Sequence, residues 1–511
     1  MNQPTVRVRF APSPTGGLHL GGVRTVLYNY LFARKHGGQF IVRVEDTDQT
    51  RFVEGAEQYI FDCLKWCGLE PDESPLHGGE YGPYRQSERK PSYLKYAEDL
   101  IAKGFAYYAF DTPAELEQMR NELKSPENPA PQYDGTVRNK MKNSLTLSKE
   151  EVTQLISVNT AHVIRIKMPD QETISFNDMI HGEVSFESAL VDDKVLLKAD
   201  GMPTYHLAVV VDDYLMKITH AFRGEEWLSS APVHILLWKH LFGLDSMPQW
   251  AHLPLILGPS GKLSKRDGAK YGFPVFAMNW NDPSSGELTE GFKEKGFLPE
   301  AFLNLLAVLG WNDGTEQEIF SLAELIEKFT IERVHKGGAK FDFEKASWYN
   351  HEWIKKLDSS LYAPLVKSML QSKGIVIETD EQLLEVVELV KDRCSLITDF
   401  YAQGKFFFTG PTEYDLASVL PKWNEEKNVF FDLFVQKLAA VSSWKFADME
   451  AEFKSLSTEQ NIKPGELQMI LRVMLVGTKI GPAVLTIAET IGKAETITRI
   501  QKAMEAFSAA S

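Results

Sequence analysis

A loop rich in proline and glycine lies near the N-terminus and reads Phe10-Ala-Pro-Ser-Pro-Thr-Gly-Gly-Leu-His-Leu-Gly-Gly22. Residues 6–10 before it alternate between apolar and polar side chains, which predicts a strand. The prolines end that strand because they cannot continue its hydrogen-bond ladder. Apolar residues then recur at helical spacing, which predicts an amphipathic helix: Val23, Val26, Leu27, Tyr30 and Leu31. The loop is therefore expected to join a strand to a helix, and its glycines let a ligand approach the backbone.

The start of this helix is a candidate site for a phosphate group. Unpaired backbone N–H groups and the helix dipole meet at about Gly21, where an anion is stabilised. His19 can donate a hydrogen bond to the same place. Taken alone, the segment also fits a glycine-rich turn with a solvated histidine, so a second signal is needed.

That second signal is the cationic stretch Lys262-Leu-Ser-Lys-Arg266. Residues 253–257 before it are apolar and predict a buried strand, and Gly258-Pro-Ser-Gly261 predicts a loop. A run of charges is often only a solvated surface. Here the flanking glycines indicate a loop that can close its cations over a leaving pyrophosphate, and such fixed charge is usually the largest catalytic contribution. The two stretches together predict a site that holds a nucleoside triphosphate from two sides.

The pair of motifs resembles the HIGH and KMSKS signatures of class I aminoacyl-tRNA synthetases, with His19-Leu-Gly-Gly22 as the first and Lys262-Leu-Ser-Lys-Arg266 as the second. The surrounding Ala11-Pro-Ser-Pro-Thr-Gly16 is similar to that of the bacterial glutamyl-tRNA synthetases. The resemblance extends from about residue 5 to about residue 480. Further matching blocks are Val44-Glu-Asp-Thr-Asp48, Pro203-Thr-Tyr-His-Leu207, Val211-Asp-Asp213, Arg223-Gly-Glu-Glu-Trp227 and Gly310-Trp311.

The resemblance implies a glutamate–tRNA ligase. Such an enzyme activates L-glutamate with ATP to glutamyl-adenylate, transfers the glutamyl group to the 3′-terminal adenosine of tRNA(Glu), and releases AMP and diphosphate. ATP is then a substrate that brings Mg²⁺. The alternatives are a glutaminyl-tRNA synthetase, a short paralogue without an anticodon-binding part, and a non-catalytic tRNA-binding relative. Pro14-Thr-Gly16 argues against the glutaminyl-tRNA synthetase. The length of 511 residues argues against the short paralogue, and the intact motifs argue against the non-catalytic relative.

Charge complementarity supports glutamate as the amino acid. Its two carboxylates suit guanidinium groups, which bind them through two parallel hydrogen bonds, and its ammonium suits a carboxylate. Arg9, Glu45 and Arg223 stand at the ends of predicted strands, where doubly wound sheets bind ligands. Two other interpretations stay open. Tyr205 and Trp227 can be plain core aromatics, and Glu45 can pair with Arg43 or Arg51. The resemblance implies a glutamate site made of Arg9, Ala11, Ser13, Glu45, Tyr205, Arg223 and Trp227.

The same resemblance, together with the two motifs, predicts the ATP site. Its expected residues are Pro12, Thr15, Gly16, Gly17, His19, Gly21, Gly22, Lys262, Ser264, Lys265 and Arg266. Of these, His19, Lys262 and Lys265 are the expected catalytic residues, because their charge and hydrogen bonds can offset charge that spreads over the triphosphate. No protein metal site is expected.

Strand and helix patterns alternate over residues 5–105, which predicts parallel βαβ units. Strand signals return at residues 207–211. We therefore expect an α/β fold with a Rossmann-type doubly wound catalytic domain formed by residues 1–105 and 200–275. The resemblance implies an inserted acceptor-end-binding domain at 106–199, a stem-contact region at 276–380 and an all-α anticodon-binding domain at 381–511. Helical apolar stripes at 383–390 and 431–438 are expected to be core.

Bulk properties fit a cytoplasmic monomer that spans no membrane. No apolar run reaches the roughly 18 residues of a membrane-spanning helix. The net charge of −15 argues against a general polyanion binder, so tRNA would meet local basic surface. Three cysteines suit a reducing compartment. Cys63 and Cys67 lack the third and fourth ligands of a structural zinc, so we expect buried free thiols and no zinc.

Overall fold

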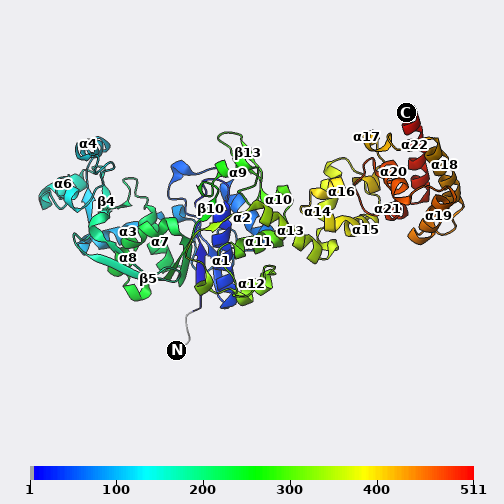
Figure 1. Cartoon of the computed structure of the whole chain (residues 1–511). Coiled ribbons are helices and arrows are strands. Elements are labelled where there is room, and N and C mark those ends of the chain that lie inside the picture. Colours follow the sequence, from blue (N-terminus) through cyan, green and yellow to red (C-terminus); the bar gives the residue numbers. More distant parts are fainter. Residues whose placement is uncertain (1–4, 511) are drawn as a thin grey trace. The chain divides into compact units, whose positions relative to one another are not determined.

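The computed structural model describes residues 5–510, which form two compact units (Figure 1). Unit 1 is Met1–Glu294 with Pro299–Phe343, and unit 2 is Lys295–Leu298 with Glu344–Ser511. Within the described residues, no helix is both long enough and apolar enough to cross a membrane.

A parallel four-stranded sheet forms the centre of unit 1, with the order β2-β1-β8-β9. Its strands are β1 (Arg7–Phe10), β2 (Gln39–Val42), β8 (His220–Gly224) and β9 (Gln249–Leu253). The order places β8 on the other side of β1 from β2, which is the arrangement of a doubly wound sheet. The expected Rossmann-type fold is confirmed, and the carboxyl ends of all four strands lie along one edge.

Helix α1 (Leu20–Lys35) connects β1 to β2, as the spacing of apolar residues predicts. Its side chains at 23, 26, 27 and 31 are fully buried. Helix α8 (Ala231–Leu241) makes the corresponding connection between β8 and β9. Both crossovers leave the strand ends open to a ligand, which is where the loop after β1 lies.

The strand predicted at residues 207–211 is wrong, because this run lies inside helix α7 (Tyr205–Leu215). All five residues are buried in a core cluster shared with α3 (Lys90–Ala102) and α8. A short apolar run that is buried on every side has no alternating pattern, so its period does not separate strand from helix. The run reaches the length of a helix only when the buried acids Asp212 and Asp213 are included in the element.

The single strand predicted at residues 253–257 is also wrong. Strand β9 ends at Leu253, and β10 (Ile256–Gly258) belongs to a different sheet with β11 (Gly261–Lys262) and β14 (Ala339–Lys340). Pro254 stands at the break, since proline lacks the N–H that a central strand needs.

Between β2 and β8 the chain forms small antiparallel sheets. Strands β3 (Ala106–Ala109), β4 (Val163–Ile166) and β7 (Val195–Leu197) make one sheet, and β5 (Thr173–Asp178) pairs with β6 (Gly182–Glu187) in another. The other α-helices that begin within residues 5–343, apart from α13, are α2 (Ala56–Cys67), α4 (Pro113–Leu123), α5 (Gly135–Arg138), α6 (Lys149–Ser157), α9 (Lys265–Tyr271), α10 (Phe292–Lys295), α11 (Pro299–Val308) and α12 (Leu322–Lys328). Strands β12 (Trp280–Asn281) and β13 (Leu288–Thr289) form a short hairpin.

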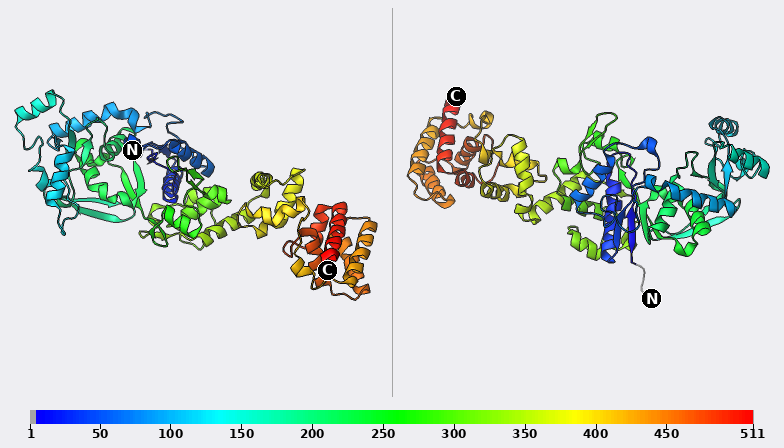
Figure 2. Two further views of the ribbon diagram at one scale, coloured as in Figure 1. Left: turned by 90° about the horizontal axis from the view of Figure 1, so that it is seen from above. Right: turned by 180° about the vertical axis from the view of Figure 1, so that it is seen from behind.

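Unit 2 is built from helices, and Figure 2 shows them in yellow to red from two further sides. Both expected apolar stripes are core: the first is buried on α15 and the second on α18. The helices are α13 (Phe343–Lys356), α14 (Ser359–Ser372), α15 (Asp380–Val390), α16 (Asp399–Phe408), α17 (Leu416–Val419), α18 (Glu425–Ala440), α19 (Phe446–Glu459), α20 (Pro464–Val476), α21 (Val484–Ile491) and α22 (Lys493–Ala510).

Candidate active site

A cavity of about 980 Å³ lies at the carboxyl ends of β1 and β8. The loop after β1, the start of α1, the residues after β2 and the loop before α9 all contribute to it. The expected site residues that line it are Arg9, Ala11, Pro12, Ser13, Thr15, His19, Gly21, Gly22, Glu45, Tyr205, Arg223, Trp227, Lys262, Ser264 and Lys265. Gly16, Gly17 and Arg266 are not part of this lining. Residues more than 200 positions apart in the chain are thus brought to one space.

The start of α1 faces this cavity with unpaired backbone donors. The N–H of Leu20 bonds to the carbonyl of Val275 at 3.0 Å, and the N–H of Val23 bonds to the carbonyl of His19 at 3.1 Å. Between them, the N–H groups of Gly21 and Gly22 find no acceptor among residues 5–510. A Cβ on Gly21 would meet nothing within 4 Å. The helix therefore presents free N–H groups and its positive dipole end to a ligand.

His19 occupies the N-cap position of this helix, where its side chain makes no capping hydrogen bond, and it is neutral at physiological pH. Burial, and then the positive charges of Lys262 and Lys265, lower the pKa of His19 to about 4. Its ring meets Phe276 edge-on, with 5.8 Å between ring centroids. A neutral imidazole in this place can donate a hydrogen bond to a phosphate oxygen and adds no positive charge of its own.

Gly17 has a structural reason to be glycine, whatever ligand the cavity holds. A Cβ at this position would lie 2.9 Å from the indole of Trp280 and 3.1 Å from Phe276. The backbone of the loop therefore packs directly on aromatic side chains of the segment before and within β12, which fixes the path of the chain into α1.

The cationic loop places its lysines in two different environments. The ammonium of Lys262 pairs with the carboxylate of Glu226 at 3.1 Å, and the two side chains are 58% and 44% exposed. The ammonium of Lys265 lies 5.0 Å from the centre of the Phe276 ring. Ser264 caps α9, with its N–H and hydroxyl both bonded to Asp267 at 2.9 and 2.6 Å. Exposed lysines next to a capped helix start can turn towards a triphosphate without disturbing the core.

Arg223 provides a buried positive charge at the end of β8. It lies in the cavity wall and is 6% exposed. Its Nη1 donates to the hydroxyl of Tyr205 at 3.2 Å, whereas its Nη2 is buried and has no acceptor among residues 5–510. A buried donor without a partner is costly. A bound carboxylate would satisfy it.

Tyr205 and Trp227 differ in how far they belong to the core. Their rings pack against one another at 4.6 Å. Tyr205 also packs on the core cluster of α7 and α8, whereas Trp227 is 43% exposed. The interpretation as a plain core aromatic thus holds in part for Tyr205, which also lines the cavity, and it does not hold for Trp227.

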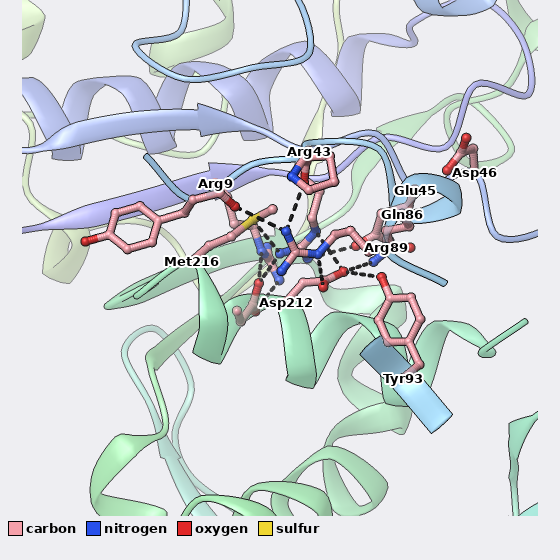
Figure 3. A network of polar contacts seen from close by, with 12 residues as sticks. Arg9, Arg43, Glu45, Asp46, Gln86, Arg89, Tyr93, Asp212 and Met216 are labelled. Carbon is pink, nitrogen blue, oxygen red and sulfur yellow. Dashed lines mark hydrogen bonds and ion pairs between the residues drawn. The ribbon is translucent and has the colours of Figure 1, made fainter. Parts of the chain in front are cut away.

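Arg9 and Glu45, which line the cavity, also belong to a buried network of charges (Figure 3). Asp213 accepts from Arg9 twice at 3.2 Å and from Arg43 at 2.7 Å. Arg43 in turn donates to Glu45 at 3.0 Å, so of the two alternative partners of Glu45, Arg43 and Arg51, the structure shows Arg43. The neighbouring Asp212 accepts from Gln86, Arg89 and Tyr93, which converge on it in Figure 3.

The charges of this network balance, with guanidinium groups of Arg9, Arg43 and Arg89 against carboxylates of Glu45, Asp212 and Asp213. Burial raises the pKa of Asp213, but Arg9 and Arg43 outweigh burial and hold that pKa below its ordinary value. For Glu45, burial dominates over Arg43 and Arg9, and its pKa is raised. Glu45 is therefore a carboxylate whose ionised form gains from a further cation, such as an ammonium group.

The sequence did not reveal that Asp213 pairs with Arg9 and Arg43, although Val211-Asp-Asp213 is one of the blocks that resemble the family. A usable signal existed, because two acids follow the apolar run at 207–211, and acids are buried only when they are paired. No local signal pointed to His234 and His252, which accept hydrogen bonds from Arg223, or to Asp178, which accepts one from His252.

No cluster of three or more histidine, cysteine, aspartate or glutamate side chains within residues 5–510 has the arrangement of a metal site. Cys63, Cys67 and Cys394 are buried free thiols, as expected for the first two. Burial raises the pKa of Cys63 and Cys394 to about 12, so both thiols are protonated and poor ligands.

Family comparisons agree with this fold and site. Residues 5–348 match the model of the catalytic domain of class I tRNA synthetases (E and Q), and residues 344–504 match that of an anticodon binding domain. The protein is thus a class I tRNA synthetase of the glutamate and glutamine group.

Comparison with individual relatives distinguishes between the glutamate and glutamine branches of this group. Over 506 residues the chain is 49% identical to a glutamate–tRNA ligase of Amoebophilus asiaticus, covering 99% of this chain and 98% of that one. It is also 49% identical to a glutamate–tRNA ligase of Phocaeicola vulgatus, covering 99% of both. A crystal structure of a glutamate tRNA ligase from Elizabethkingia meningosepticum in complex with its amino acid has a TM-score of 0.93 and 46% identity, covering 98% and 99% of the two chains. The chain belongs to the glutamate–tRNA ligase family.

Proposed function

We propose that this chain activates L-glutamate with ATP and transfers the glutamyl group to the 3′-terminal adenosine of tRNA(Glu), releasing AMP and diphosphate. The observation that carries the proposal is a single cavity whose wall contains both a helix start with unpaired N–H groups and the buried, incompletely bonded Arg223. Such a cavity suits a triphosphate and an acidic amino acid side by side.

In the first step, the α-carboxylate of glutamate attacks the α-phosphorus of ATP in line, and pyrophosphate leaves. The N–H groups at the start of α1 and neutral His19 bind phosphate oxygens, while Lys262 and Lys265 offset the charge that spreads over the leaving group. Lys262 must leave Glu226 to do this, and exposure of that ion pair makes the exchange inexpensive. Mg²⁺ enters as part of the ATP substrate and neutralises phosphate charge.

In the second step, the 2′-hydroxyl of the terminal ribose takes the glutamyl group from the adenylate. No side chain of the enzyme forms a covalent bond, so its contribution is positioning and electrostatics. Arg9, Tyr205 and Arg223 face the side-chain carboxylate, Glu45 faces the ammonium, and Ala11, Ser13 and Trp227 complete the wall. The phosphates of ATP meet the segment from Pro12 to Gly22 and the 262–266 loop.

The remaining assignments complete the proposal. Residues 106–199 hold the acceptor end of tRNA, 276–380 contact its stem, and the helices of 381–511 read the anticodon. The protein works as a monomer. It works in the cytoplasm, and the three free thiols agree with that compartment. It holds no structural zinc.

Charging of purified tRNA(Glu) and tRNA(Gln) with labelled glutamate and labelled glutamine tests the proposal. We expect glutamate on tRNA(Glu), consumption of one ATP per product, and no attachment of glutamine. Attachment of glutamine in preference to glutamate would identify a glutaminyl-tRNA synthetase. Binding of tRNA without ATP consumption would identify a non-catalytic relative.

A further inference from the structure

The guanidinium group of Arg223 is held on three sides by uncharged groups. Its Nε donates to Nε2 of His252 at 2.9 Å, and its Nη1 donates to Nδ1 of His234 at 3.1 Å. The plane lies over the ring of Trp250, 4.7 Å from the ring centre. With Tyr205 on Nη1 as well, only Nη2 has no acceptor among the described residues.

These contacts fix the protons of both imidazoles, because arginine only donates hydrogen bonds. The Nε2 of His252 must accept, so its proton is on Nδ1, which donates to the carboxylate of Asp178 at 2.6 Å. The Nδ1 of His234 must also accept, so its proton is on Nε2, which donates to Nδ1 of His206 at 3.1 Å. Asp178 is itself held by the backbone N–H groups of residues 180, 181 and 252.

Both imidazoles are neutral as a result. Burial, opposed by the hydrogen bond to Asp178, lowers the pKa of His252 to about 4. Burial and then the charge of Arg223 lower the pKa of His234 well below its ordinary value. Arg223 therefore differs from Arg9, whose guanidinium is paired directly with the carboxylate of Asp213.

We propose that His252 and His234 are positioning residues that hold Arg223 through fixed neutral tautomers, and that this neutral cradle makes Arg223 select the side-chain carboxylate of glutamate over the amide of glutamine. The inference rests on the proposed function and adds residues to it. A guanidinium whose directly bonded partners are all neutral gains most from an anion, whereas a neutral amide leaves it without a directly bonded counter-charge, because the carboxylate of Asp178 lies behind His252. An acidic partner in place of either histidine would remove this preference.

A pair of substitutions at residue 252 separates the hydrogen bond from packing. His252→Gln places an amide oxygen near the former Nε2 and keeps an acceptor for Arg223. His252→Phe keeps a ring against Phe176 and Trp250 but removes the acceptor. Glutamate charging is measured with tRNA(Glu) present, with glutamine as a competing inhibitor.

We expect His252→Phe to raise KM for glutamate about ten- to hundredfold, as when a buried donor loses its acceptor, with KM for ATP unchanged. The inhibition constant of glutamine should change much less, so that the preference for glutamate falls. His252→Gln should stay within about threefold of wild type. Equal effects of the two variants, or equal weakening of glutamate and glutamine, would overturn the proposal.

The wild-type protein provides an independent measurement. In ¹⁵N-histidine-labelled protein at neutral pH, we expect the Nδ1–H tautomer for His252 and the Nε2–H tautomer for His234. The opposite tautomers, or an imidazolium at either residue, would overturn the cradle even if the enzyme charges glutamate normally. Absence of glutamate charging by the wild type would instead contradict the proposed function, while the tautomer measurement would still decide the cradle.

Discussion

Replacement of Asp213 by asparagine tests whether one buried carboxylate holds both halves of the amino-acid site. Asp213 accepts hydrogen bonds from Arg9 and Arg43, and Arg43 also donates a hydrogen bond to Glu45. The change Asp213→Asn keeps the shape of the side chain and one acceptor oxygen but removes the negative charge. Two buried guanidinium groups then share less negative charge than before.

The size of the effect follows from the burial of the pair. Breaking a buried ion pair by removing one partner costs about 3–5 kcal/mol, because a charge is left uncompensated. The retained amide oxygen and the remaining carboxylates of Glu45 and Asp212 place the expected loss near the lower end, about 3 kcal/mol. The free energy of unfolding of unit 1 should fall by this amount, and KM for glutamate should rise because Arg9 and Glu45 lose their support.

Hydrogen exchange of the β1 and β2 amides, read by mass spectrometry, measures this loss without mixing in unit 2. A change of about 3 kcal/mol corresponds to roughly a hundredfold loss of protection. The control is Asp99→Asn, which breaks an exposed pair with Lys103 and should cost less than about 1 kcal/mol. Equal protection in the two variants would refute the structural role of Asp213.

The same variant gives a pH signature. The folded-state pKa of Asp213 is held below its ordinary value, so its charge contributes stability above the ordinary carboxyl pKa of about 3.9. This contribution is lost as pH falls through the folded-state pKa. The difference in stability between wild type and Asp213→Asn should therefore shrink below about pH 4. A difference that stays constant into acid would contradict this account.

Three further predictions concern the chemistry. Lys265→Ala should slow adenylate formation by about two to three orders of magnitude in rapid-quench experiments while glutamate binding stays nearly unchanged, and retention of most of the rate would mean that the loop has another role. Arg223→Ala should weaken glutamate binding by about 2–5 kcal/mol in calorimetry with ATP binding spared, whereas equal loss of both ligands would indicate a purely structural arginine. Metal analysis of chelator-washed protein should find well under one zinc per chain, and a stoichiometric zinc would contradict our expectation of no structural zinc site.

Local patterns were enough to predict the part of the fold that we propose binds phosphate. Strand β1 and helix α1 follow from an alternating run, prolines that end it and one apolar helical face, all within about 30 residues. Helix α7 could not be predicted in the same way, because its apolar residues are buried on every side and show no period. Pro254 signalled the end of β9, but the apolar residues around it hid that signal.

The site divides along the same line. Residue types matched to the charges of glutamate led to Arg9, Glu45 and Arg223, and all three lie in the wall of one cavity. Their supports could not be found, because Asp213 lies 204 residues from Arg9 and Asp178 lies 74 residues from His252. Contacts at such separations arise from topology and leave no spacing pattern in the sequence.

The long separation within the buried charge network has a consequence for synthesis of the chain. Arg9 and Arg43 leave the ribosome 204 and 170 residues ahead of Asp213. At about 5–20 residues per second, these arginines wait roughly 10–40 s for their partner. Arrested nascent chains that end before residue 205 should therefore leave β1 and β2 open to protease, and full protection there would contradict this order. Arg9 and Arg43, in and beside the proposed amino-acid site, can pair with Asp213 only after translation has passed through the entire segment of residues 106–199.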